Sequence, residues 1–410
     1  MTLLEGIRVL DLSRILAGPW ATQVLADFGA DVIKVERPGA GDDTRGWGPP
    51  FLKDADGHDT TESAYYLCAN RGKRSVAIDF TLPEGQALIR ALAARCQVLV
   101  ENYKVGGLAK YGLDYASLRA VNPALVYCSI TGYGQDGPYA QRAGYDAAIQ
   151  AIGGLMSVTG EPDDAPGGGP QKVGVAATDL MTGMYAATAI LAALRHAERS
   201  GQGQHIDLAL LDTQVAWLAN QASNWLVGGV VPERQGTAHP NIVPYQVMPA
   251  ADGYFMLAVG NDAQFARLCG VIGEPQLAAD PRYATNAARV AHRAELVLLL
   301  KQRLRTRPAA HWLAALEQAV VPANPVNRID QVFEDAQVRA RGLRIELPHA
   351  GGGTVAMVRN PLKFSATPLR YGQAAPVLGQ HTAQVLQDML LLDADRLREL
   401  QAAGVLGGNG

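Results

Sequence analysis

The chain has 410 residues, of which 48% are apolar and 18% charged, and a formal net charge of −3. Because a single hydrophobic core stops growing beyond about 250–300 residues, this length predicts two structural lobes. The charge balance excludes a strongly basic nucleic-acid surface and an acidic tail, so a polyanionic ligand requires a local cluster of Lys and Arg. Four scattered cysteines and the lack of a secretory signal pattern predict a reduced, cytoplasmic protein.

Short β-branched runs alternate with helical patterns over the first 130 residues. The runs predict strands at 7–12, 31–36, 75–79, 97–101 and 125–130, with helices beginning near Gly18 and spanning 83–94. This alternation predicts an α/β fold with a mostly parallel sheet. Ligands of such sheets bind beyond the carboxyl ends of the strands, which points to 13–18, 37–41 and 102–107.

The pattern changes after residue 131. Turn formers dominate 132–170, and the periodicity then predicts long helices over 179–199 and 207–227. The apolar run 180–194 is too short for a membrane span, so we expect a buried helix and no membrane partner. Further along we predict a strand at 254–259, helices at 265–272 and 293–305, a linker at 321–326, strands at 343–347 and 354–359, and a helix at 382–391.

Several motifs that carry chemistry are missing from the sequence. It has no G-x-G-x-x-G after the first predicted strand, no Walker A sequence, no G-x-S-x-G elbow and no H-E-x-x-H. The eight histidines are dispersed. We therefore predict neither a metal site nor a tightly bound cofactor.

Asp179 comes directly before a long apolar stretch, and two roles suit a carboxylate there. As an N-cap it would satisfy an unpaired backbone N–H and complement the helix dipole. As a nucleophile it would attack an activated acyl group such as a thioester, and its ordinary pKa near 3.9 makes it anionic at neutral pH. The residues by themselves favour the cap, and the two roles are compatible.

Two further groups of residues suggest a binding site. Tyr145 and the glycine-rich stretch 153–160 would supply a donor and a mobile flap beside Asp179, although a core tyrosine and an ordinary turn are the alternatives. Basic residues that follow predicted strands suit a ligand with several phosphates, although each taken singly reads as a solvated surface charge. These are Arg14, Arg37, Arg71, Lys73, Arg74, Lys104 and Lys110.

A series of motifs runs through nearly the whole chain. It opens with GIRVLDLSRILAGPWATQVLADFGADVIKVERPGAGDDTR and continues with NRGKRSVAIDF, VLVENYKVGGLAKYGLDY, YCSITGYGQDGPY, GGLMSVTGEP and GQGQHIDLALLDT. HPNIVPYQ, DGYFMLAVGND, NPVNRIDQVFEDAQVRARG and PVLGQHTAQVL complete it. Together these motifs resemble the class III CoA-transferases, the family of the formyl-CoA and carnitine CoA-transferases.

The resemblance implies a set of site residues. Asp179 becomes the catalytic nucleophile, because Gly174, Gly183 and Met184 complete the family pattern G-x(4)-D-x(3)-G-M around it. Tyr145 matches the family's active-site tyrosine, and we expect the backbone N–H groups of Gly153 and Gly154 to stabilise an oxyanion. The implied contacts to CoA, which is a substrate, come from Arg14, Ile15, Leu16, Ala17, Arg37, Ile78, Asn102, Tyr103, Lys104 and Lys110.

The resemblance also implies an architecture, an intertwined, ring-like homodimer. Each chain would have a large Rossmann-like domain built from both chain ends, which we place at 1–225 and 331–410. A small α+β domain at 226–330 would be inserted between them. The discontinuous pattern of strands and helices along the sequence agrees with this organisation.

Two departures from the family pattern bear on the substrate. Formyl-CoA transferases carry Gln where Leu16 lies, and their run of glycines in the small domain is missing, which disfavours oxalate and formate. The stretch GTAHPNIVPYQ takes the place of that run, and we expect its His239 and Tyr245 to shape an acyl pocket, with the partner subunit as one source of them.

Two alternatives to a transferase remain at this point. The 2-methylacyl-CoA racemases carry a catalytic His where this chain has Tyr145, and a tyrosine, with an ordinary pKa near 10, is a poor base at neutral pH. A non-catalytic CoA-binding protein is the other, and Asp179 beside the glycine-rich stretch argues against it. The expected reaction moves CoA from an acyl-CoA donor, with succinyl-CoA as the first candidate, to a carboxylic acid. It passes through an aspartyl–acyl anhydride and an aspartyl–CoA thioester.

Overall fold

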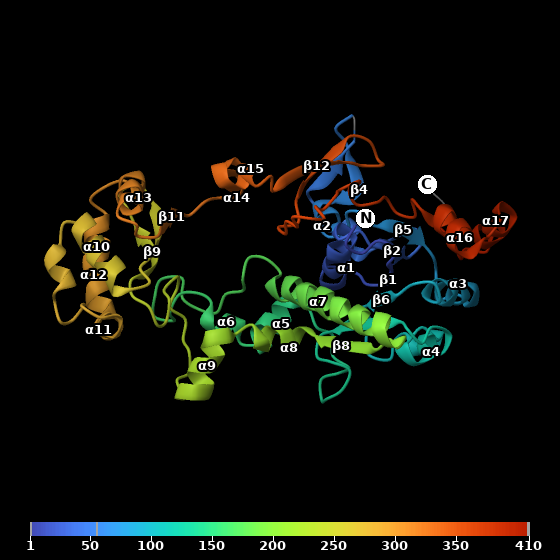
Figure 1. The fold of residues 1–410 in the computed structure, drawn as a ribbon, viewed down its shortest axis with the longest axis horizontal. Helices are drawn as coiled ribbons and strands as arrows, with labels where there is room; N and C mark the ends of the chain where they lie inside the picture. The colour runs from blue at the N-terminus through green and yellow to red at the C-terminus, as the bar shows by residue number, and fades with distance from the viewer. Residues whose placement is uncertain (1, 55, 408–410) are drawn as a thin grey trace. The chain divides into compact units, whose positions relative to one another are not determined.

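The structure is a computed structural model that describes residues 2–54 and 56–407. The chain folds into two compact units. Unit 1 is made of Met1–Leu155, Val173–Ala222 and Gln337–Gly410, and unit 2 of Met156–Lys172 and Ser223–Ala336. Segments from both ends of the chain therefore build unit 1 (Figure 1).

A six-stranded sheet whose strands are all parallel forms the centre of unit 1, as the alternation of strands and helices predicts. The strand order is β5-β2-β1-β6-β7-β8, so the chain winds outward on one side of β1 and then on the other side from β6. The loops that follow β1 and β6 consequently diverge. The strands are β1 (Arg8–Asp11), β2 (Asp31–Glu36), β5 (Arg74–Ala77), β6 (Val98–Glu101), β7 (Val126–Thr131) and β8 (His205–Ala209).

Helices cover both faces of this sheet, because successive residues of a strand point to opposite faces. Val9 enters a core formed with α1 and α7, and Leu10 enters a core formed with α3, α16 and α17. Figure 1 shows α1 beside α7, and α16 beside α3. The helices of unit 1 include α1 (Ala17–Asp27), α2 (Ala64–Cys68), α3 (Pro83–Ala93), α4 (Tyr115–Val121), α5 (Asp146–Ile152), α7 (Ala177–Ser200), α8 (Leu210–Ala216), α15 (Ala336–Ala340), α16 (Thr382–Leu390) and α17 (Ala394–Ala402).

Among the residues that the structure describes, α7 is the one helix with the length and apolar character of a membrane span. It packs along α1 and buries Ala186, Ala187 and Ile190 in the core. The helix predicted over 180–194 is therefore confirmed, but only one of its faces is buried, since Met184 and Tyr185 are exposed. The packing is close, because a Cβ atom at Gly183 would lie 2.7 Å from the carbonyl oxygen of Ala17. Gly183 therefore lets the two helices approach.

Two predicted elements were wrong. The helix predicted over 207–227 is in fact β8 followed by two shorter helices, α8 and α9 (Ala219–Gly228), and Ala219, where α9 begins, has a φ of 46°. Residues 205–209 pair in parallel with β7, and this partner distant in sequence overrides the local helical pattern. The linker predicted at 321–326 contains β11 (Ala323–Pro325), which pairs with β10 (Tyr254–Ala258).

Unit 2 has its own sheet and core. Its antiparallel sheet has the order β11-β10-β9, and helices pack on it through a core that includes Phe255, Phe265 and Trp312. The predicted strand at 254–259 and the helices at 265–272 and 293–305 are confirmed. Besides β10 and β11, unit 2 contains β9 (Tyr245–Pro249), α10 (Asp262–Val271), α11 (Asn286–Ala291), α12 (Arg293–Leu304), α13 (Ala309–Gln318) and α14 (Ile329–Glu334).

The C-terminal segment returns to the N-terminal sheet. After the antiparallel hairpin β12 (Arg344–Pro348) and β13 (Thr354–Val358), the chain forms α16 and α17 and then lies beside the end of β5. There the Asp79 N–H donates to the carbonyl of Val405 at 2.8 Å, and the Gly407 N–H donates to the carbonyl of Ala77 at 3.0 Å. Val405 and Leu406 are buried in the core with α3 and α16.

This packing predicts that Leu406 supports the fold of unit 1. Leu406→Ala should lower the free energy of unfolding by about 2–5 kcal/mol, the usual cost of emptying a buried leucine site. Leu391→Ala is the matched control, because Leu391 is 80% exposed, and its effect should stay within about 0.5 kcal/mol. Urea denaturation followed by tryptophan fluorescence measures both, and equal effects would contradict the packing described here.

Candidate functional site

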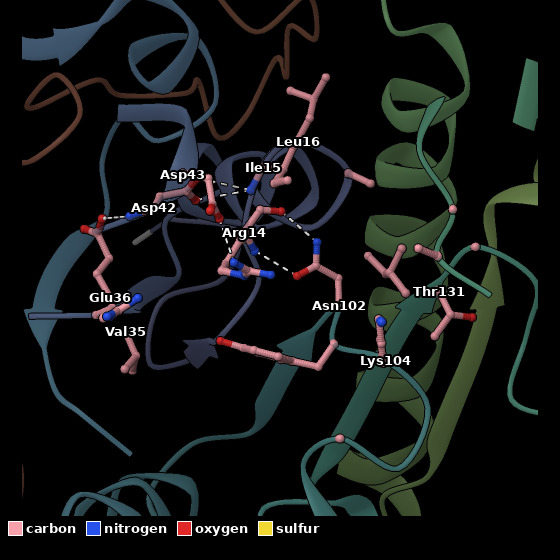
Figure 2. Close-up of a pocket in the computed structure, with 18 of the residues that line it drawn as sticks. Arg14, Ile15, Leu16, Val35, Glu36, Asp42, Asp43, Asn102, Lys104 and Thr131 are labelled. Atoms are coloured by element: carbon pink, nitrogen blue, oxygen red, sulfur yellow. Dashed lines mark hydrogen bonds and ion pairs between the residues drawn. The ribbon is translucent and has the colours of Figure 1, made fainter. Parts of the chain in front are cut away.

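A cavity of about 860 Å³ opens in unit 1 where the loops after β1 and β6 diverge. This is the point at which open α/β sheets bind their ligands, and the volume is in the range of a small-molecule site. Its walls come from the carboxyl ends of several strands and from the starts of α1, α5, α7 and α8. Figure 2 shows part of this wall, with Arg14, Ile15 and Leu16 after β1, Asp42 and Asp43 after β2, and Asn102 and Lys104 after β6.

Asp179 lies in this cavity and is not the N-cap of α7. The helix begins at Ala177 with Ala176 as its N-cap, and the Ala176 side chain makes no capping bond. The capping acceptor is instead Asp146, whose Oδ2 accepts from the N–H groups of Thr178 at 2.8 Å and Asp179 at 3.2 Å. The N-cap interpretation of Asp179 was therefore wrong, and its own carboxylate is left for the cavity.

The environment of Asp179 changes its acidity. Burial, followed by the negative charge of Asp146, raises the pKa of Asp179 to about 7 from an ordinary value of 3.8. The prediction that the Asp179 carboxylate keeps its ordinary pKa and is anionic at neutral pH was therefore wrong. A carboxyl group with a perturbed pKa in a cavity is a frequent mark of a reactive group.

Asp146 was missed by sequence reasoning although it directly follows Tyr145. It is the first residue of α5, and its Oδ1 accepts from Nε2 of Gln150 at 2.6 Å. Both carboxylate oxygens are thus held, one within α5 and the other at the start of α7. An acidic residue at the start of the helical stretch DAAIQAI is an ordinary first-turn signal. Nothing in the sequence therefore shows that Asp146 also caps a second helix.

Tyr145 also lines the cavity, whereas Gly153 and Gly154 do not. Tyr145 is the N-cap residue of α5 and is 64% exposed. The N–H of Gly153 donates to the carbonyl of Ile149 at 2.7 Å, and the N–H of Gly154 donates to the carbonyl of Ala151 at 3.4 Å. Because both donors are used at the end of α5, this conformation does not offer them to an oxyanion in the cavity.

All ten residues predicted to contact CoA line the cavity. The sequence places them in four stretches, and the parallel sheet brings these stretches to one edge. Within them the Asn102 side chain brackets the backbone of Arg14, accepting from its N–H at 2.9 Å and donating to its carbonyl at 2.7 Å. The ten are Arg14, Ile15, Leu16, Ala17, Arg37, Ile78, Asn102, Tyr103, Lys104 and Lys110.

The predicted cluster of seven basic residues divides into two groups. Arg71, Lys73 and Arg74 do not line the cavity; they form ion pairs with Asp27, Asp11 and Asp31 at 2.6, 3.1 and 2.5 Å. Arg14 lines the cavity and pairs with Asp43 at 2.7 Å. The remaining three of the seven line the cavity and have no carboxylate partner within residues 2–54 and 56–407: Arg37, Lys104 and Lys110.

His239 and Tyr245 belong to unit 2 and form a local pair. Their rings meet edge to face with centroids 5.4 Å apart, and the His239 N–H donates to the carbonyl of Tyr245 at 2.9 Å. Arg293 holds the backbone between these two residues, because its Nη2 donates to the carbonyls of His239 and Pro240. Their role in an acyl pocket stays a prediction.

Comparisons with known proteins agree with the chemistry of this cavity. A sequence model described as CoA-transferase family III matches residues 4–382. A succinate–glutarate CoA-transferase of Agrobacterium fabrum is 56% identical over 386 residues, which cover 94% of this chain and 95% of that protein. The human succinyl-CoA:glutarate CoA-transferase is 45% identical over 403 residues, which cover 98% of this chain and 90% of that protein.

A solved structure is also similar. A CAIB/BAIF family protein from Brucella suis superposes with a TM-score of 0.83 at 50% sequence identity, and the match covers 95% of this chain and 99% of that one. Neither the racemase nor the non-catalytic alternative is favoured by these relatives. The chain belongs to CoA-transferase family III.

Proposed function

We propose that this protein moves CoA between dicarboxylic acids, with succinyl-CoA as donor and glutarate as acceptor, through a covalent intermediate on Asp179. The observation that carries the proposal is a carboxyl group of raised pKa in the same cavity as cations that lack counter-ions. The choice of acids rests on the relatives at 56% and 45% identity, whose names contain succinate or succinyl-CoA and glutarate.

The reaction proceeds by four acyl transfers. The Asp179 carboxylate attacks the donor thioester carbonyl, which forms an aspartyl–acyl anhydride and releases the CoA thiolate. The thiolate then attacks the aspartyl carbonyl of the anhydride, so that the donor acid leaves and an aspartyl–CoA thioester remains. The acceptor carboxylate attacks this thioester to give a second anhydride and the thiolate again. In the last step the thiolate takes the new acyl group, and Asp179 is regenerated as a carboxylate.

Asp146 favours the covalent intermediates through charge. Both burial and the Asp146 carboxylate destabilise the negative charge on Asp179, as the raised pKa indicates. In the anhydride and in the thioester Asp179 carries no charge, so acylation removes the repulsion between the two side chains. Asp146 also keeps Asp179 at the helix start through the two N–H bonds at Thr178 and Asp179.

The unpaired cations account for CoA binding. Lys104 and Lys110 follow β6, and Arg37 follows β2, at the same edge of the sheet. CoA carries a pyrophosphate and a 3′-phosphate, and charge-assisted hydrogen bonds from Lys and Arg suit these groups. We assign this role to unit 1.

We further propose the intertwined homodimer, the cytoplasmic location and the acyl-pocket role of His239 and Tyr245.

Asp179→Asn should abolish transfer from succinyl-CoA to glutarate while CoA still binds, because only the nucleophile is lost. Mass spectrometry of the acyl-CoA products measures transfer, and calorimetry measures CoA affinity. The unsubstituted enzyme quenched after mixing with donor alone should carry CoA on the peptide that contains Asp179. Asp212→Asn is the matched control, since Asp212 also lies in a first helical turn but is exposed and outside the cavity lining. Wild-type turnover by Asp179→Asn would refute the nucleophile.

The rate should depend on pH through Asp179. With its pKa raised to about 7, kcat/KM should fall as the pH drops below about 7, because the protonated acid does not attack. Asp146→Asn keeps a side-chain oxygen for the N–H groups of α7 but removes the charge, so the acidic limb should move to lower pH. A pH profile of both proteins tests this, and an unmoved limb would show that Asp146 does not set the acidity.

The same pKa predicts a stability effect. A carboxyl group whose pKa rises from 3.8 unfolded to about 7 folded binds more protons in the folded state, so its contribution to stability is lost as the pH rises between these values. Asp179→Asn should therefore raise the thermal midpoint at pH 8 and have less effect at pH 5. Differential scanning calorimetry at both pH values measures this, and an equal shift at both would argue against a raised pKa.

A further inference from the structure

The loop after β1 has a backbone conformation that its sequence disfavours. Ile15 has a φ of 73°, in the left-handed region, where a β-branched side chain crowds the backbone. Ile15 lies in the cavity wall together with Arg14, Leu16 and Ala17. A conformation of this kind persists only where the surrounding structure holds it, and it occurs most often at ligand sites.

Two polar side chains hold the two residues that precede Ile15. Nζ of Lys34 donates to the carbonyl of Ser13 at 3.0 Å, and Asn102 bonds both the N–H and the carbonyl of Arg14. The N–H of Ile15 itself points to Asp42, whose two carboxylate oxygens lie 3.2 and 3.3 Å away (Figure 2). The unusual residue thus has one side-chain partner, Asp42.

Asp42 is held in turn by groups beneath the cavity. Its Oδ2 pairs with Nζ of Lys34 at 2.8 Å, and neither side chain has exposed surface. Its Oδ1 accepts from the N–H of Thr44 at 3.0 Å and from the Thr44 hydroxyl at 2.7 Å. Burial acts to raise the pKa of Asp42, but Lys34 and Thr44 lower it to about 2, so the acceptor stays ionised over the working pH range.

We propose that Asp42 is a positioning residue for acyl-CoA, which holds Ile15 in the left-handed conformation and thereby sets residues 14–17 for binding. This inference rests on the proposed function for the identity of the ligand. A loop that already has its bound conformation loses less conformational entropy when the ligand binds. This contact between Asp42 and Ile15, called the clamp below, therefore acts on CoA affinity rather than on the covalent steps.

The test compares Asp42→Asn in two backgrounds. Ile15→Val keeps the β-branched side chain and its steric penalty, whereas Ile15→Gly removes the penalty, because glycine adopts positive φ readily. In Asp42→Asn the side-chain oxygen can still accept from Thr44. The NH2 group that replaces the other oxygen is a donor, so it cannot accept from the Ile15 N–H or from Lys34. Asp42→Asn should weaken CoA binding about tenfold with Ile15→Val and about twofold or less with Ile15→Gly, as measured by calorimetry.

Hydrogen exchange of the ligand-free protein gives a second readout that does not depend on the reaction. The Ile15 amide should exchange slowly in the unsubstituted protein and fast after Asp42→Asn. If Asp42→Asn fails to fold because Lys34 loses its partner, the double substitution Lys34→Met/Asp42→Leu removes both charges. Its effect on CoA affinity is then compared between the Ile15→Val and Ile15→Gly backgrounds in the same way. Unchanged CoA affinity, or an equal loss in the two backgrounds, would overturn the clamp. The two proposals can also fail separately. If Asp42→Asn loses protection at the Ile15 amide and binds CoA more weakly, but the unsubstituted protein transfers no CoA from succinyl-CoA to glutarate, Asp42 holds the loop as proposed and the proposed function is wrong.

Discussion

A buried charge organises the wall of the candidate-site cavity in unit 1. Lys34 lies in the middle of β2 without exposed surface, and an ammonium group in that position requires a partner and hydrogen bonds. Asp42 is that partner, and its remaining hydrogen bonds hold Ile15 and start the short helix at Asp43–Gly46. The same short helix directs Arg45 to Glu36, at 2.8 Å. The shape of the cavity therefore depends on neutralising one lysine.

A second constraint on the cavity is the proximity of two carboxyl groups, those of Asp146 and Asp179, at the start of α7. Asp146 satisfies the first N–H groups of α7, a task that its neighbour Asp179 would otherwise share. Because Asp146 makes these bonds, the Asp179 carboxylate is left for the cavity, where burial and then the charge of Asp146 raise its pKa. A group that is poorly stabilised as an anion but loses its charge on acylation suits a family that transfers acyl groups to and from CoA.

Ion pairing separates structural cations from those available to a ligand. Arg71 and Lys73 are buried and each contacts an aspartate, so they serve the fold. Lys104 and Lys110 line the cavity without a carboxylate partner in the part of the chain that the structure describes. All of these residues are basic and follow or adjoin predicted strands, so only their neighbours in space distinguish them.

The sequence by itself determined most local elements of the large unit and supplied most of the candidate site residues that line the cavity. The strand at 31–36 and the helices beginning near Gly18 and Pro83 follow from side-chain periodicity, which depends on neighbours along the chain. The family motifs pointed to Asp179 and to ten residues for CoA contact, and the structure brings all eleven to one cavity. In a parallel sheet the loops that follow the strands lie at the same edge, so the predicted α/β pattern already implies that these loops come together.

The tertiary structure alone decided the features that depend on partners far apart in sequence. Residues 205–209 became a strand because β7 was available to pair with them. Asp179 was released from capping by Asp146, 33 residues earlier in the chain, and Ile15 took a left-handed conformation because Asp42 accepts its N–H. Gly153 and Gly154 lost their expected role because the end of α5 uses their N–H groups. In each case a contact formed only on folding outweighs the local preference, since hydrogen bonds and buried charges are satisfied by position in space and not by position along the chain.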